Sequence, residues 1–232
     1  MDSRTVLLYV CAVAVIVAGF QVIGAVYPAE RQPGPVTPDR LVRIAVAAWR
    51  RPAWLTGAFL VVTIVLTILQ WPYPAILHTL ERDPNGMAGG QWWRLVTAQF
   101  VQSSGLVQTV VNLPALALVG AVAETVLGRA RWLLVYLASG IAANAVSAAG
   151  WAPIGAGSSV FICGLVGALA TSYLIEATDW TLPRLLAPLV PLAGIVLCLL
   201  ANNHGIGVLT GSALGALLSL RRIPEIRTAR AR

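Results

Sequence analysis

The stretch SSVFICGLVGALATSYLI, residues 158–175, decides the fold class of this chain. It is 18 residues long, carries no charged side chain and mixes small residues with large apolar ones. A helix that spans a bilayer needs about 20 mostly apolar residues, and small residues let neighbouring helices pack closely inside a membrane. The stretch therefore predicts a transmembrane helix packed within a helical bundle.

The composition of the whole chain points to the same class. Of its 232 residues, 58% are hydrophobic and only 11% are charged, whereas about a quarter of the residues of a soluble domain are charged. All 16 basic residues are arginine, and the net charge is +7. In a membrane protein such charge marks cytoplasmic flanks and anionic headgroups, and no basic run interleaved with aromatics indicates nucleic-acid binding. We expect an integral membrane protein whose partner is the lipid bilayer, not nucleic acid.

Seven apolar runs predict an all-α polytopic fold. They cover about 6–27, 54–70, 106–123, 132–150, 158–175, 185–201 and 204–220. We expect four parts: an N-terminal transmembrane helix (1–27), a Pro/Arg-rich cytoplasmic linker (28–53), a six-helix membrane domain (54–220) and a basic cytoplasmic tail (221–232). The first run could instead be a signal peptide, although its length favours a retained helix.

The arginines predict how the chain is oriented. Thirteen of the 16 arginines fall in the linker, in the tail or in two turns predicted on the same side of the membrane as these. The other three fall in segments on the opposite side. Because arginine accumulates in cytoplasmic loops, we expect the N-terminus outside and the C-terminus in the cytoplasm, in a bacterial plasma membrane. This topology places Ser158, Ser159 and His204 at the outer ends of their helices.

A serine and a histidine at one depth are candidates for nucleophilic catalysis. A serine hydroxyl is a poor nucleophile until a base removes its proton, and histidine is the usual base. His204 shares a helix face with Gly207, Gly211 and Gly215, at offsets of 3, 7 and 11 residues. That face predicts close approach of another helix, with ordinary small-residue packing as the alternative to a catalytic role.

The positions of the other polar residues are compatible with more than one role. Gln108 and Asn112 share one face of the third run and could donate to an oxyanion or hydrogen-bond between helices. Glu124 is predicted to be an ion-pair or capping residue, and Trp92, Trp93 and Arg94 suit an interfacial segment. Cys11, Cys163 and Cys198 lie inside apolar runs without metal-ligand spacing, so we expect no metal.

Five motifs in order resemble the rhomboid family of intramembrane serine proteases over roughly residues 54–220. They are WWRLVTAQF, the helix containing Asn112, ETVLGRARWLLVYLASG, GSSV and HGIGVLTG. The resemblance implies a Ser159–His204 dyad, an oxyanion held by the Ser159 N–H, Asn112 and Gln108, and cleavage of transmembrane protein substrates near the extracytoplasmic face without a cofactor. It also implies that a further set of residues belongs to the family's structural motifs: Gly157, Gly164, Gly167, Gly207, Gly211, Trp93, Arg94 and Glu124.

Three positions depart from the family pattern and keep a second function open. Gln108 stands where many members have histidine, Val160 where glycine is usual, and Cys163 where an aromatic residue often packs on the catalytic histidine. A catalytically inactive rhomboid-like protein that binds or escorts membrane clients would explain all three. A small transporter is a weaker alternative, because the runs hold almost no charge at mid-membrane.

Overall fold

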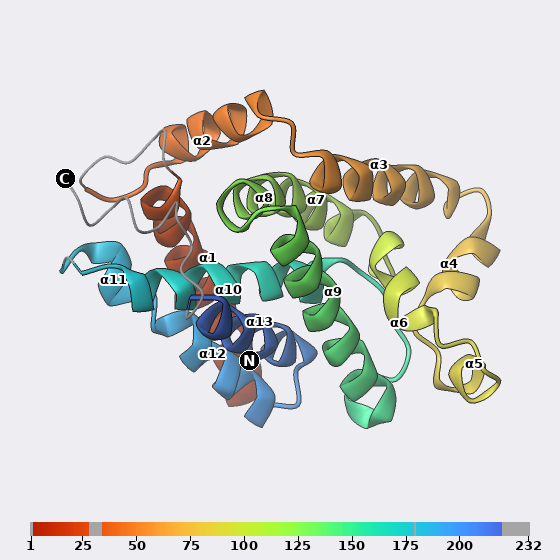
Figure 1. The fold of residues 1–232 in the computed structure, drawn as a ribbon. Coiled ribbons are helices and arrows are strands. Elements are labelled where there is room, and N and C mark those ends of the chain that lie inside the picture. Colours follow the sequence, from red (N-terminus) through yellow and green to blue (C-terminus); the bar gives the residue numbers. More distant parts are fainter. Residues whose placement is uncertain (1, 28–33, 179, 220–232) are drawn as a thin grey trace.

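The computed structural model describes residues 2–27, 34–178 and 180–219, and the regular elements in these ranges are helices (Figure 1). The longer ones are α1 (Ser3–Val26), α2 (Pro38–Arg50), α3 (Trp54–Leu69), α7 (Gly105–Ala115), α9 (Arg129–Val146), α10 (Ser159–Glu176), α12 (Leu189–Leu199) and α13 (Asn203–Ser219). Short helices α4 (Pro74–Leu80), α5 (Pro84–Ala88) and α6 (Arg94–Thr97) build the segment between α3 and α7. This architecture confirms the predicted all-α polytopic class.

Five helical segments in the described ranges are long and apolar enough to cross a membrane. They are Ser3–Val26, Gly105–Leu127, Arg129–Trp151, Ser159–Glu176 and Leu182–Leu199. α3 has 16 residues and reaches that length only when joined to α2, from which it is bent by 105°. α13 has 17 described residues and falls just short. All seven predicted runs are therefore helical, but two of the helices are shorter than the usual span.

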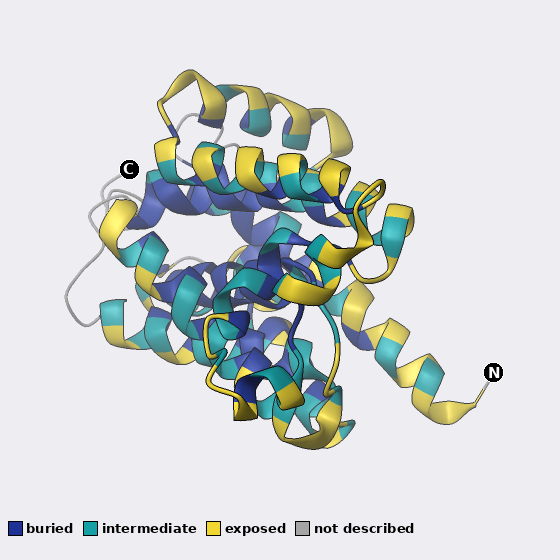
Figure 2. Cartoon of the chain, turned by 90° about the vertical axis from the view of Figure 1, so that its right-hand side faces the viewer, coloured by how far each residue is buried: buried dark blue, intermediate teal, exposed yellow. Residues whose placement is uncertain are grey.

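Helix α10 lies at the centre of the bundle, packed against α13, α9 and α1 (Figure 1). It has buried residues all round, among them Phe161, Leu165 and Leu169. A helix without a polar face belongs in the interior of a bundle. Figure 2 shows the buried residues gathered in the middle of the molecule, whereas the N-terminal part of α1 extends outward and is mostly exposed.

Glycines set the distance between α10 and α13. A Cβ added at Gly207 would overlap the carbonyl oxygen of Val160, and one at Gly211 would overlap that of Gly164. Gly215 meets Ala168 in the same way. Each step advances four residues on both helices, so the two helices run parallel with backbone against backbone. This register brings the first residues of both helices together.

The third span is one helical segment with an irregular middle. It consists of α7, a π-helical turn η3 (Leu116–Gly120) and α8 (Ala121–Leu127). Pro114 lies inside it, and proline removes one hydrogen-bond donor and crowds the preceding turn. At its end, the Glu124 carboxylate accepts hydrogen bonds from the backbone N–H groups of Leu55 and Thr56, so it caps the start of α3.

The predicted linker contains a helix, α2, that its prolines did not indicate. Residues 34–37 have no regular structure, but Thr37 caps α2, and Pro38 occupies its first turn, where a missing N–H costs nothing. The Arg40 guanidinium donates to Gly24 O at 3.0 Å and so fastens α2 to the end of α1. Proline at a helix start is favourable, so the segment predicted as a linker includes a helix over 38–50.

Candidate active site

The starts of α10 and α13 place a serine and a histidine in contact. His204 Nε2 lies 2.9 Å from Ser159 Oγ, and both residues are half-buried. The parallel glycine register between the two helices produces this contact, although the residues are 45 positions apart in sequence. The structure thus brings together the two residues that the sequence singled out.

Asn202 fixes the orientation and the tautomer of the histidine ring. Its Oδ1 accepts the backbone N–H of His204 at 3.0 Å and lies 2.9 Å from His204 Nδ1. Because the backbone N–H can only donate, the shared amide atom must be oxygen, so Nδ1 carries a proton and donates to it. The lone pair of Nε2 then faces Ser159. The sequence analysis missed Asn202, although an asparagine just before a helix is a common capping signal.

Ser158, the other serine of the pair, is in a different environment. It is fully buried, and its Oγ makes no hydrogen bond within the described part of the chain. Its carbonyl accepts from Phe161 and Ile162 in the first turn of α10. Of the two serines, only Ser159 therefore meets a base.

The loop before Ser159 is held against the third span. Gly157 has φ +139°, a conformation that favours glycine, and a Cβ there would overlap the Gln108 side-chain nitrogen. Gln108 Nε2 donates to Ala156 O at 2.8 Å, and Asn112 Nδ2 donates to Gln102 Oε1 at 2.8 Å. Each amide nitrogen carries a second N–H, so both residues keep one donor for another acceptor beside this loop.

Two arginines stabilise the loops around the site. Arg82 is buried, donates to Ala152 O at 2.6 Å and to Asn144 Oδ1 at 2.5 Å, and pairs its backbone with Gly155. Burial lowers the pKa of Arg82 to about 10, so it stays charged at neutral pH. Arg94 donates to the carbonyls of His78 and Glu81 at 2.7 and 2.8 Å. The sequence analysis missed Arg82.

The other residues that the family resemblance singled out make structural contacts. Trp92 and Trp93 are exposed beside Arg94, as an interfacial segment requires. Glu124 is at the far end of the third span from Gln108 and binds the start of α3 as well as Arg129, 3.5 Å away. Gly164 packs on Ser139 and Gly167 on the carbonyl of Val208. Val160 and Cys163 lie in or against the apolar core.

We expect Arg82→Gln to slow reaction of Ser159 with a serine-directed probe about tenfold. The shorter side chain cannot reach the carbonyl of Ala152 and Asn144 together, and a misplacement of about 1 Å costs roughly 10²-fold in a catalytic site. Loss of these buried hydrogen bonds should also lower the free energy of unfolding by about 2 kcal/mol. The measurements are labelling rate and thermal unfolding of the purified protein.

Arg184→Gln is the matched control for this change. It removes the same charge from α11 (Leu182–Leu186), where Arg184 lies over the Trp180 ring at 5.2 Å. Labelling at the wild-type rate by both variants would show that Arg82 does not position the loop.

Comparisons with known proteins identify the family of this chain. The rhomboid domain family matches residues 89–223. The Bacillus subtilis protein named "Putative rhomboid protease YdcA" is 36% identical over 94 residues, covering 36% of this chain and 47% of YdcA. Rhomboid protease GluP of Bacillus subtilis is 40% identical over 88 residues, covering 38% of this chain and 17% of GluP. This chain thus covers less than half of the length of each relative. The family match, however, covers more than half of this chain, and the chain therefore belongs to the rhomboid family.

Proposed function

We propose that this protein is an intramembrane serine endopeptidase that cleaves transmembrane protein substrates. The observation that carries the proposal is the 2.9 Å contact between His204 Nε2 and Ser159 Oγ. Heavy-atom distances of about 2.6–3.2 Å between a nucleophile and its base are those at which a proton can be transferred. Both Bacillus subtilis relatives carry the words "rhomboid protease" in their names, which supports this reaction class.

The reaction begins with proton transfer from Ser159 Oγ to His204 Nε2. The hydroxyl oxygen attacks the scissile carbonyl carbon, forming a tetrahedral intermediate, and Asn202 Oδ1 stabilises the resulting imidazolium through Nδ1–H. The imidazolium then protonates the leaving amine, which leaves an acyl-enzyme. His204 then deprotonates a water molecule, whose oxygen attacks the acyl carbon. The bond from that carbon to Ser159 Oγ breaks, the imidazolium returns a proton to Oγ, and the carboxylic acid product leaves.

The oxyanion requires hydrogen-bond donors beside Ser159. Ser159 is the first residue of α10, and the first N–H groups of a helix have no partner within the helix. The Ser159 N–H and the second N–H groups of Asn112 and Gln108 are the donors that we assign to this role. Such preorganised donors stabilise charge most strongly where water is excluded, which suits a site between membrane helices.

The proposed topology places cleavage near the extracytoplasmic face. The Arg4 guanidinium, at the start of α1, donates to Leu200 O at the end of α12, so both helix ends lie on the side of Ser159 and His204. The arginine distribution assigns this side to the exterior, with the linker helix and the C-terminus in the cytoplasm.

The proposal is tested with purified protein in liposomes. A fluorophosphonate probe should label one site per chain, and a co-reconstituted single-span reporter should be cut near its outer end. Folded protein that neither reacts with the probe nor cuts any of a panel of single-span reporters would contradict the proposal.

A second candidate is a non-catalytic rhomboid-like protein that binds membrane clients. The observation in its favour is that Gln108 and Asn112 each already donate to a protein acceptor. Client capture without probe labelling would support this candidate, whereas labelling at Ser159 supports the protease.

A further inference from the structure

Helix α1 packs against the bundle through one face that runs along its whole length. The buried or half-buried residues of this face recur at steps of three and four, and they are Leu8, Cys11, Val15, Ala18 and Val22. Such spacing keeps one helix face against its neighbours, which here are α12, α10 and α11. Arg4 lies on the same face one turn before Leu8, and it reaches the end of α12 (Figure 1).

The turn of residues 200–202, which leads from α12 into α13, contains a strained residue. The Ala201 N–H donates to Cys198 O and the Asn202 N–H to Leu197 O, both at 2.9 Å. These two bonds form a Schellman helix end, in which the residue after the C-cap is left-handed and is usually glycine. Here that residue is Ala201, with φ +51°. A residue with a Cβ in this region is strained and persists only where its surroundings hold it.

Arg4 supplies a contact that holds this turn. Its guanidinium donates to Leu200 O, the carbonyl just before Ala201, at 3.0 Å. The last carbonyls of a helix have no partner within the helix, and a hydrogen bond from a charged donor is stronger than one between neutral groups. The Asp2 carboxylate accepts the Thr5 N–H and so fixes the first turn of α1, from which Arg4 extends.

The same turn determines where the His204 ring lies. Asn202, directly after Ala201, accepts the backbone N–H of His204 at 3.0 Å and lies 2.9 Å from its Nδ1. Rotation of the strained turn would move Asn202 Oδ1, and the ring would lose the acceptor that fixes its tautomer. The carbonyl that Arg4 binds is thus four residues from the base itself.

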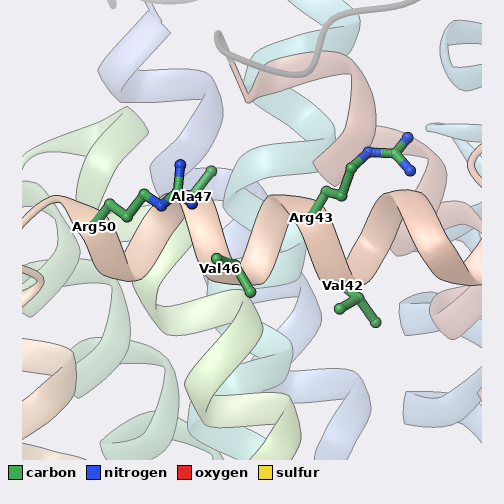
Figure 3. A pocket seen from close by; sticks show the side chains of 5 residues that line it. All are labelled: Val42, Arg43, Val46, Ala47 and Arg50. Atoms are coloured by element: carbon green, nitrogen blue, oxygen red, sulfur yellow. The ribbon is translucent and has the colours of Figure 1, made fainter.

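The other end of α1 is fixed by the segment that contains α2. Gln21 and Val36 exchange two hydrogen bonds, at 3.0 and 3.4 Å, and Arg40 donates to Gly24 O at 3.0 Å. A shallow pocket on the exposed side of α2 is lined by the side chains that Figure 3 shows: Val42, Arg43, Val46, Ala47 and Arg50. This pocket is separate from the site, because α2 meets α1 at the end opposite to Arg4. Since α1 is held at this end, Arg4 cannot follow the turn unless the whole helix shifts.

We propose that α1 is a clamp on the turn of residues 200–202 and that Arg4 is a positioning residue for His204. The proposal rests on the proposed function, because it gives α1 a part in the same site. A helix outside the six-helix domain thereby keeps Ala201 in its left-handed conformation, in which Asn202 orients the base.

The first measurement is the rate of fluorophosphonate labelling of the full chain in liposomes. Arg4→Met should react about fivefold more slowly than wild type, because a misplacement of about 1 Å in a catalytic site is costly. Arg4→Lys keeps an N–H donor, so it should stay within about twofold of wild type. Arg184→Met is the matched control, since it removes the same charge from α11, and it should react like wild type.

Ala201→Gly distinguishes a role at the turn from a general role in packing α1. Glycine adopts a positive φ without strain, so a turn with glycine needs the clamp less. Adding Ala201→Gly to Arg4→Met should therefore return labelling to within about twofold of wild type. A defect in the packing of α1 would not be repaired by this change.

A second measurement requires no activity, because it reports on the His204 ring. The chain has two histidines, so isotope labelling of histidine ring nitrogens in a His78→Gln background leaves His204 as the observed ring. At alkaline pH, where imidazole is neutral, the nitrogen chemical shifts should show one tautomer, with the proton on Nδ1. Arg4→Met should move both shifts toward the average of the two tautomers, and added Ala201→Gly should reverse this.

The two measurements separate the clamp from the protease. Wild-type shifts in Arg4→Met would overturn the clamp, and so would an equal loss in Arg184→Met or the failure of Ala201→Gly to restore the shifts. Wild type that does not react with the probe, but whose His204 shifts depend on Arg4, would contradict the protease alone. Thermal unfolding checks that every variant is folded.

Discussion

Ser159→Ala is expected to abolish fluorophosphonate labelling and to lower substrate cleavage by about 10⁴-fold or more. The variant removes the oxygen that lies 2.9 Å from His204 Nε2, which is the nucleophile that we assign to that base. The side chain it shortens makes no other hydrogen bond among the described residues, so the fold should persist. Labelling stoichiometry and cleavage of a single-span reporter in liposomes measure the effect.

Ser158→Ala is the adjacent control. It removes a buried hydroxyl that has no hydrogen bond among the described residues, so labelling should stay within about twofold of wild type. The reverse pattern, with labelling lost in Ser158→Ala and kept in Ser159→Ala, would refute the assignment of the nucleophile.

Gly211→Val has the largest expected effect on stability. Any Cβ at this position would overlap the carbonyl oxygen of Gly164, which is backbone and cannot rotate away. Overpacking a core costs about 1–3 kcal/mol and occasionally more, and here α13 must separate from α10. We expect the free energy of unfolding to fall by about 3 kcal/mol or more, with a melting temperature lower by about 6–12 °C.

Probe labelling should fall together with stability, because separating the two helices also separates His204 from Ser159. Ala213→Val is the matched control, since residue 213 lies on the exposed face of the same helix. It should melt and react like wild type. Wild-type melting and labelling in Gly211→Val would show that the helices do not depend on this contact.

Much of the architecture could be predicted because a bilayer imposes simple length and polarity limits. The run at 158–175 lacks charge, and the structure has α10 over nearly the same residues. The prolines of residues 28–53 predict a linker but do not indicate α2, because a proline at position one of a helix resembles a proline in a loop. Its amphipathic pattern was the signal that could have revealed the helix.

The site was predictable only where the residue type itself limits the chemistry. Serine and histidine are conspicuous in apolar runs, so Ser159 and His204 could be proposed from sequence and family resemblance. Arg82 and Asn202 could not, because an arginine in a loop and an asparagine before a helix are common. Their roles depend on contacts with the carbonyl of Ala152 and with His204 Nδ1.

The sequence by itself determined that this chain is a helical membrane protein, since the hydrocarbon core admits only long apolar helices or closed barrels. It also singled out the residues that we propose to react. Only the tertiary structure decided that they meet, because backbone contact at Gly207 and Gly211 aligns two parallel helices in one register. It also gives the physical reason why Ser159, the residue that the family resemblance implied, contacts His204 and Ser158 does not: successive residues of a helix point about 100° apart.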